Sequence, residues 1–168
     1  RYSNFLSSLP IAHQSWENYH EYQEKFVSLL KTSIKSKLIV RCHYPDHGNN
    51  HFQRWIDNKN VSNVDNGTQN IRNLIKKSRI FITTYNATTF LESLTANFPT
   101  LIYWDKKMWE TREDAFEYLE MLKKAEILHY SYKSASVKLN EVWDDIDSWW
   151  NNTELQSLKN KFCDQYAN

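Results

Sequence analysis

Short apolar runs alternate with amphipathic segments along this chain, and this alternation constrains its fold more than any other feature. The clearest run, residues 79–83, is Arg-Ile-Phe-Ile-Thr, and the next, residues 100–104, is Thr-Leu-Ile-Tyr-Trp. Both are too short for the core of a helix and are typical of buried strands. Apolar residues at helical spacing lie between them, from Asn86 to about Asn97. Strands that alternate with helices predict an α/β fold, a Rossmann-like parallel sheet with helices on both faces.

The rest of the chain fits the same pattern. We expect weaker strands at residues 38–40, 61–64 and 127–128, and helices at residues 13–30, 70–77, 113–124, 134–146 and 153–166. The expected organisation is an amphipathic helix and lead-in at residues 1–36, a Rossmann-like domain at residues 37–150, and a C-terminal helix at residues 151–168 that packs on that domain. The helical N- and C-terminal segments therefore flank a single sheet.

Composition excludes several classes of protein. The 168 residues suit one domain, and 21 Lys and Arg against 20 Asp and Glu argue against a nucleic-acid-coating protein. With only 2 glycines the chain has neither a P-loop nor a GxGxxG turn. Its 2 cysteines, Cys42 and Cys163, form neither a disulfide framework nor a metal motif, which favours a reducing compartment. The chain begins at Arg1, so we expect it to derive from a longer protein.

The segment after the 79–83 strand is the strongest candidate site. Asn86 is a residue type that caps helices, and the free N–H groups of the helix it would begin form an anion site without any glycine loop. Thr88 and Thr89 add hydroxyl donors, and Glu92, one turn later, is placed to accept hydrogen bonds from ribose or sugar hydroxyls. The alternative is that these residues are ordinary capping and surface residues.

A second loop, residues 41–48, follows the predicted strand at residues 38–40. Arg41 offers a bidentate fork for phosphate, and His43 offers a further donor. The spacing of His43, His47 and His51 raises the alternative of a metal site, but a proline and a glycine within the loop argue against the helix that would align these rings. A plain surface loop is the other alternative.

Two aromatic and acidic segments carry weaker signals. Trp104 and Trp109 flank the loop after the 100–104 strand, where they either wall a pocket or pack in the core. Asp144, Asp145 and Asp147 offer a carboxylate pair for acid–base chemistry, but the start of a helix and a solvated face explain them more simply.

Three runs resemble one family. Residues 84–92 (Thr-Tyr-Asn-Ala-Thr-Thr-Phe-Leu-Glu), residues 97–104 and residues 142–150 resemble the carboxyl-terminal half of transferases from bacterial surface-polysaccharide gene clusters, including lipopolysaccharide biosynthesis. Such proteins are similar to GT-B glycosyltransferases, in which two Rossmann-like domains face each other and the carboxyl-terminal one holds a nucleotide-sugar donor. This chain would then be one half of a GT-B fold. Arg41-x-His43 also resembles a motif of transferases that use CMP-activated acidic sugars, although Tyr44 stands where that motif has proline.

The resemblance implies specific roles. Asn86, Thr88, Thr89, Arg41 and His43 would bind the donor phosphates, and Glu92 the ribose or sugar; no catalytic residue is assigned. The nucleotide-sugar is a substrate, and we expect no metal or other cofactor. The partner would be a missing amino-terminal domain, without which the chain turns over little or nothing. Nucleic acid is not expected as a partner, the expected location is the cytoplasm, and loose association with the inner face of the membrane is compatible with that role. The alternatives are a polyol-phosphate transferase with a similar shell and a non-catalytic α/β interaction module.

Overall fold

The computed structural model describes residues 16–167 apart from residues 45, 47 and 110. The chain divides into two compact units, residues 1–78 and residues 79–168, and each is described by itself. The division falls after residue 78, whereas the boundaries expected from the sequence fall after residues 36 and 150. The predicted α/β class with parallel strands and flanking helices is confirmed, but the strands form two small sheets, one in each unit, where the sequence predicts one sheet.

The first unit contains a two-stranded parallel sheet. Its elements are α2 (Trp16–Ser28), α3 (Thr32–Lys35), β1 (Ile39–Arg41), α4 (His51–Ile56), β2 (Asn63–Asp65) and α5 (Ile71–Lys76). Val40 pairs with Val64 at the centre of the β1–β2 ladder. Phe26, Leu30 and Trp55 are among the buried side chains of its core. Arg41, expected in a loop, is the last residue of β1.

The second unit contains a three-stranded parallel sheet in the order β3-β4-β5. Its elements are β3 (Phe81–Thr83), α6 (Thr88–Thr95), β4 (Thr100–Tyr103), η3 (Lys106–Met108), η4 (Glu113–Ala115), α7 (Phe116–Lys124), β5 (Leu128–His129), α8 (Tyr132–Val142), α9 (Ile146–Trp150) and α10 (Thr153–Tyr166). The helix predicted at residues 134–146 ends at Val142, and a separate helix, α9, begins at Ile146. They separate where the Asp145 carboxylate accepts a hydrogen bond from Ser148 N and caps α9, as the simpler explanation of the acidic cluster predicts.

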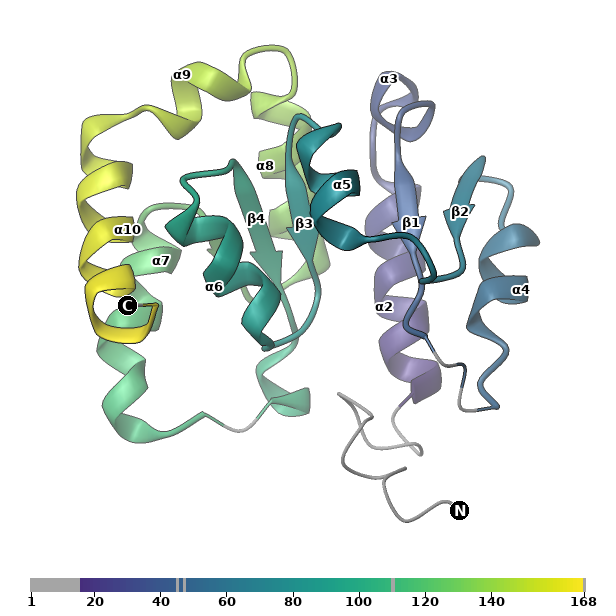
Figure 1. Ribbon diagram of the computed structural model, residues 1–168, viewed down its shortest axis with the longest axis horizontal. Coiled ribbons are helices and arrows are strands. Elements are labelled where there is room, and N and C mark those ends of the chain that lie inside the picture. The colour runs from purple at the N-terminus through teal and green to yellow at the C-terminus, as the bar shows by residue number, and fades with distance from the viewer. Residues whose placement is uncertain (1–15, 45, 47, 110, 168) are drawn as a thin grey trace. The chain divides into compact units, whose positions relative to one another are not determined.

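Helices cover both faces of this three-stranded sheet (Figure 1). Helices α6, α7 and α10 enclose one buried cluster together with β4, and α8 contacts the same strand. Ile102 belongs to the cluster, whereas Leu101 and Tyr103 alternate with it along β4 and so face the other side, toward α8. All four residues of β4 are buried, as expected for a central strand covered on both faces.

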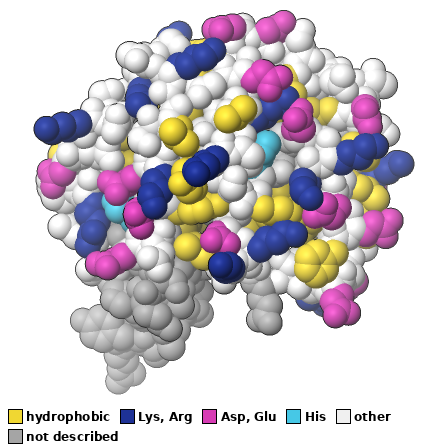
Figure 2. All heavy atoms as spheres, turned by 180° about the vertical axis from the view of Figure 1, so that it is seen from behind, with side chains coloured by type: hydrophobic (Ala, Val, Ile, Leu, Met, Phe, Trp, Pro, Cys, Tyr) yellow, Lys and Arg dark blue, Asp and Glu magenta, His cyan; other side chains and the backbone are white. Residues whose placement is uncertain are grey.

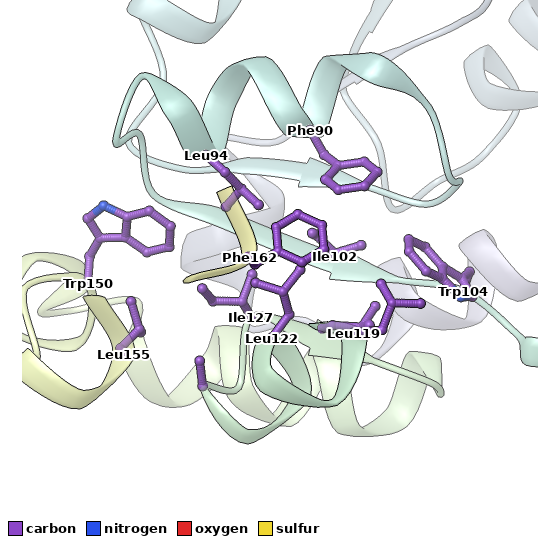
Figure 3. Close-up of a cluster of buried hydrophobic side chains, with 12 residues drawn as sticks. Phe90, Leu94, Ile102, Trp104, Leu119, Leu122, Ile127, Trp150, Leu155 and Phe162 are labelled. Carbon is purple, nitrogen blue, oxygen red and sulfur yellow. The ribbon is translucent and has the colours of Figure 1, made fainter. Parts of the chain in front are cut away.

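The cluster itself holds α6 against the sheet (Figure 3). Phe90 and Leu94 project from α6 toward Phe162 of α10, and the rings of Phe90 and Phe162 lie 6.3 Å apart between centroids. Trp104 packs at the end of β4, with its ring centroid 6.2 Å from that of Phe90. Full burial of a large apolar side chain stabilises a fold by about 1.5–3 kcal/mol, so these rings fix where α6 begins.

The turn after α6 is tied down by polar contacts. Asn97 has a φ of 51°, in the left-handed region that asparagine tolerates. The indole of Trp150 donates to Asn97 O at 3.0 Å, and the buried Lys159 ammonium donates to Asn97 Oδ1. Lys159 thereby lies beyond the carboxyl end of α6, where the helix dipole favours a cation. These contacts fix the far end of α6, so both ends of this helix have defined positions.

Among the described residues, no helix is both long enough and apolar enough to cross a membrane.

Candidate functional site

The best-defined candidate site lies at the carboxyl edge of the three-stranded sheet, where α6 begins. The sequence predicts Asn86 as the helix cap, and this is wrong by one residue. Ala87 occupies the N-cap position, with the extended backbone (φ −143°, ψ 168°) typical of a cap, and its methyl side chain makes no capping hydrogen bond. The first turn of α6 therefore begins without the side-chain acceptor that usually satisfies its N–H groups.

Polar side chains surround this helix start. Asn86 and Thr88 are exposed and Thr89 is half-buried, so the structure brings the three residues together at one helix end. Glu92 is exposed one turn further along α6. The preceding strand leads directly into this loop, where the buried Thr83 hydroxyl donates to Tyr85 O at 3.4 Å. Uncapped N–H groups, the positive end of the helix dipole and threonine hydroxyls together favour an anion.

Aromatic side chains lie beside the helix start. Tyr85 precedes Ala87 by two residues, and Trp109 follows η3 in the loop after β4. Their rings are stacked, with centroids 6.4 Å apart and planes 29° from parallel. Of the two tryptophans that the sequence places near this loop, Trp104 is buried in the core, whereas Trp109 packs against the cluster and stays partly exposed.

Arg41 and His43 belong to the first unit, where Arg41 is the last residue of β1 and His43 lies in the loop that follows. The Arg41 guanidinium donates to Gly67 O at 2.9 Å and to Gln69 O at 3.2 Å, and its Nε lies 3.5 Å from Asp65 Oδ2. The Asp65 carboxylate also accepts a hydrogen bond from Gly67 N at 3.1 Å. Arg41 therefore holds the loop that follows β2, a role that its position in the sequence does not reveal.

Gly67 explains why that loop can approach β1 so closely. A Cβ at Gly67, whose φ is +90°, would lie 2.5 Å from Cys42 O and 2.9 Å from Tyr44 Cβ. Both the positive φ and the contact require glycine. Gly48 also has a positive φ, +88°, but has no atom within 4 Å of the same position.

The loop after β1 is organised by a carboxylate that the sequence analysis missed. Asp46 Oδ1 accepts hydrogen bonds from the backbone N–H groups of Gly48, Asn49 and Asn50, at 2.9–3.2 Å. His51 Nε2 lies 3.8 Å from the same oxygen. An acidic residue five places before a helix start is the signal that points to such a turn. The carboxylate occupies these three amides, so they present no open anion site.

The histidines of this region do not form a metal site among the residues that the structure describes. No three His, Cys, Asp or Glu side chains in the described ranges are grouped so as to hold a metal ion. His47, one member of the expected trio, lies outside the described residues. Burial raises the pKa of the Cys42 thiol to about 11, which disfavours its thiolate form at neutral pH.

Charged side chains of both signs are mixed over the surface, as Figure 2 shows for the face that it draws. Lys and Arg side chains lie among Asp and Glu side chains there, in keeping with the formal net charge of +1. Attraction of an anion to the α6 site therefore depends on local donors and the helix dipole, since the mixed surface supplies little long-range field.

Comparison with known proteins decides the family. The LIC12162 family transferase matches residues 1–168, the whole chain. The chain belongs to this family. No curated protein and no solved structure matches the chain. Transferase function follows from the family, and the assignment of a site within this transferase rests on the geometry described above.

Proposed function

We propose that the second unit of this LIC12162 family transferase binds the phosphate leaving group of an activated sugar at the amino end of α6. The observation that carries the proposal is the N-cap of α6. A helix with an exposed Thr88 and a half-buried Thr89 in its first turn begins at the carboxyl edge of a parallel sheet, and the Ala87 side chain gives its N–H groups no capping acceptor. Ligands of open α/β sheets bind at this edge.

The chemistry of glycosyl transfer fits these donors. As the bond between sugar carbon and phosphate oxygen breaks, the electron pair goes to the phosphate and negative charge grows on the leaving group. Donors fixed in advance around that position stabilise the transition state more than the ground state. The N–H groups of Thr88 and Thr89 would hold the phosphate oxygens, their hydroxyls would add two donors, and Glu92 would accept from a ribose or sugar hydroxyl.

The family and the fold together support a finer proposal. A small parallel sheet with helices on both faces suits the donor-binding half of a GT-B glycosyltransferase, and we propose that role in the synthesis of a surface carbohydrate in the cytoplasm. We assign no catalytic base. Arg41 and His43 stay predicted phosphate ligands of the first unit, where Arg41 already has three partners at the end of β2 and in the loop after it.

The experiment is a titration of the ¹⁵N-labelled chain with pyrophosphate, CMP, CDP, UDP and dTDP, followed by NMR. Replacing both hydroxyls (Thr88→Val with Thr89→Val) should abolish binding while the fold, checked by circular dichroism, is retained. Thr95→Val is the matched control, because Thr95 lies at the other end of α6 and its hydroxyl donates to Leu91 O.

The outcomes separate the candidate functions. Pyrophosphate shifts confined to residues 86–92, together with nucleotide shifts that include these residues, support a glycosyltransferase or a polyol-phosphate transferase. Unchanged affinity in the double variant contradicts the phosphate assignment. No response to any of the five compounds favours a non-catalytic interaction module.

A further inference from the structure

We propose that the stacked pair of Tyr85 and Trp109 binds the planar base of a nucleotide, so that the donor of this transferase is a nucleotide-linked sugar and not a base-free phosphate. This inference rests on the proposed phosphate site at α6. It assigns a second contact, on two other loops, to the same ligand.

The position of the pair supports the inference. The loop of Tyr85 leaves β3, the loop of Trp109 leaves β4, and these strands are parallel neighbours, so both loops emerge at one edge of the sheet. Two residues of extended chain span at most about 7 Å, which keeps Tyr85 close to the α6 N-cap at Ala87. One nucleotide can therefore reach the aromatic pair with its base and α6 with its phosphates.

The geometry of the rings suits a planar ligand. A centroid separation of 6.4 Å and a tilt of 29° leave each ring only partly covered by the other. Trp109 packs against the core cluster, which holds its ring in place, while both side chains stay partly exposed. A rigid aromatic face beside a phosphate site is what proteins use to bind bases by stacking.

An unsatisfied polar atom in the pair is a second observation. The indole Nε1 of Trp109 is buried and has no hydrogen-bond partner among the described residues. Buried donors of this kind are rare, since an unmade hydrogen bond costs about 1–3 kcal/mol. A carbonyl oxygen or ring nitrogen of a base could accept a hydrogen bond from this indole. A small shift of the loop on binding would bring the indole N–H within reach of that acceptor.

The test uses indole signals of the ¹⁵N-labelled chain. The chain has 7 tryptophans, and the indole cross-peak missing from the Trp109→Phe spectrum belongs to Trp109. We expect CDP, UDP or dTDP to shift this peak and pyrophosphate to leave it in place. Trp149 is the matched control, assigned through Trp149→Phe, because its Nε1 is also buried without a partner among the described residues but it lies in α9. Figure 1 shows α9 at the opposite end of the second unit's strands from the loop after β4.

Affinities give the second readout. We expect at least one nucleoside diphosphate to bind roughly tenfold more tightly than pyrophosphate, in line with the stacking of one base. Tyr85→Leu and Trp109→Leu should each remove most of that difference without weakening pyrophosphate binding, and Trp109→Phe should keep most of it. Should a leucine variant fail to fold, the indole shift in the unmodified chain still decides the question.

Each outcome is informative. Equal affinities for pyrophosphate and all three nucleotides, with no shift of the Trp109 indole, overturn the inference and leave the phosphate site standing. Cytidine and uridine, which carry a base without phosphate, are titrated in the same way. A shift of the Trp109 indole by either nucleoside, with no response to pyrophosphate, supports the aromatic site and overturns the phosphate site. No response to nucleotide, nucleoside or pyrophosphate overturns both.

Discussion

Replacing Ala87 by aspartate should raise stability and remove anion binding together. The N-cap backbone of α6 already has the extended conformation that a capping residue needs, so a carboxylate there can accept hydrogen bonds from the first-turn N–H groups without backbone adjustment. The same groups are those proposed to hold phosphate. The two effects of the substitution therefore have opposite signs.

The magnitude follows from helix capping. Exchanging alanine for aspartate at an N-cap stabilises a protein by about 1 kcal/mol, and the negative charge at the helix start adds up to a similar amount. For a chain of this length, 1 kcal/mol raises the unfolding midpoint by about 2–4 °C. Pyrophosphate binding should fall below detection, because the carboxylate both fills the site and repels the ligand.

The assay pairs thermal unfolding with an NMR titration on one protein sample. Ala87→Ser is the matched control: it caps the helix without charge, so it should raise the midpoint with a smaller loss of binding. An aspartate variant that is no more stable, yet binds pyrophosphate as the unmodified chain does, refutes the reasoning, because the first-turn N–H groups would then have another acceptor.

Three further predictions concern stability. Gly67→Ala should lower stability by roughly 2–4 kcal/mol, because of the positive φ and the short backbone contact. Gly48→Ala, which has the positive φ alone, should lower stability by about 1–2 kcal/mol. Urea unfolding measures both variants, and equal losses of stability would contradict the role of the contact. Phe162→Ala should cost about 3–5 kcal/mol because it leaves a cavity among α6, β4 and α7, and a loss under 1 kcal/mol would place the ring outside the core. Burial lowers the pKa of His20 and of His129 in the folded chain, so below about pH 6.5 the unfolded chain binds more protons than the folded one. The free energy of unfolding should therefore fall as pH drops from about 6.5 toward the lower pKa values of the folded state. Unfolding midpoints that stay constant over that pH range would contradict the burial of both rings.

The elements that local pattern determines were predictable from the sequence. The strand predicted at residues 100–104 is β4, one residue shorter, and the helix predicted at residues 153–166 is α10. Burial on both faces and an amphipathic stripe each leave a direct trace in the sequence. The helix starts were less predictable. Asn86 is the better capping residue by type, yet Ala87 takes the cap position, since the packing of Phe90 and Leu94 on the core sets where α6 begins.

Long-range organisation was not predictable from these patterns. Two short sheets and one long sheet give the same alternation of strands and helices along the chain, so nothing local separates β1 and β2 from β3, β4 and β5. The role of Arg41 depends on Gly67 and Gln69, 26 and 28 residues away, and no spacing rule connects them. The stacking of Tyr85 on Trp109 likewise appears only when β3 and β4 are paired.

The most direct test of the central assignment is a pyrophosphate titration that follows the backbone amide signals of Thr88, Thr89 and Phe90 in the ¹⁵N-labelled chain. We predict that these three amides shift most, saturate together and stop responding in Ala87→Asp. Largest shifts at any other segment, or no shift of these amides at millimolar pyrophosphate, would contradict an anion site at the start of α6.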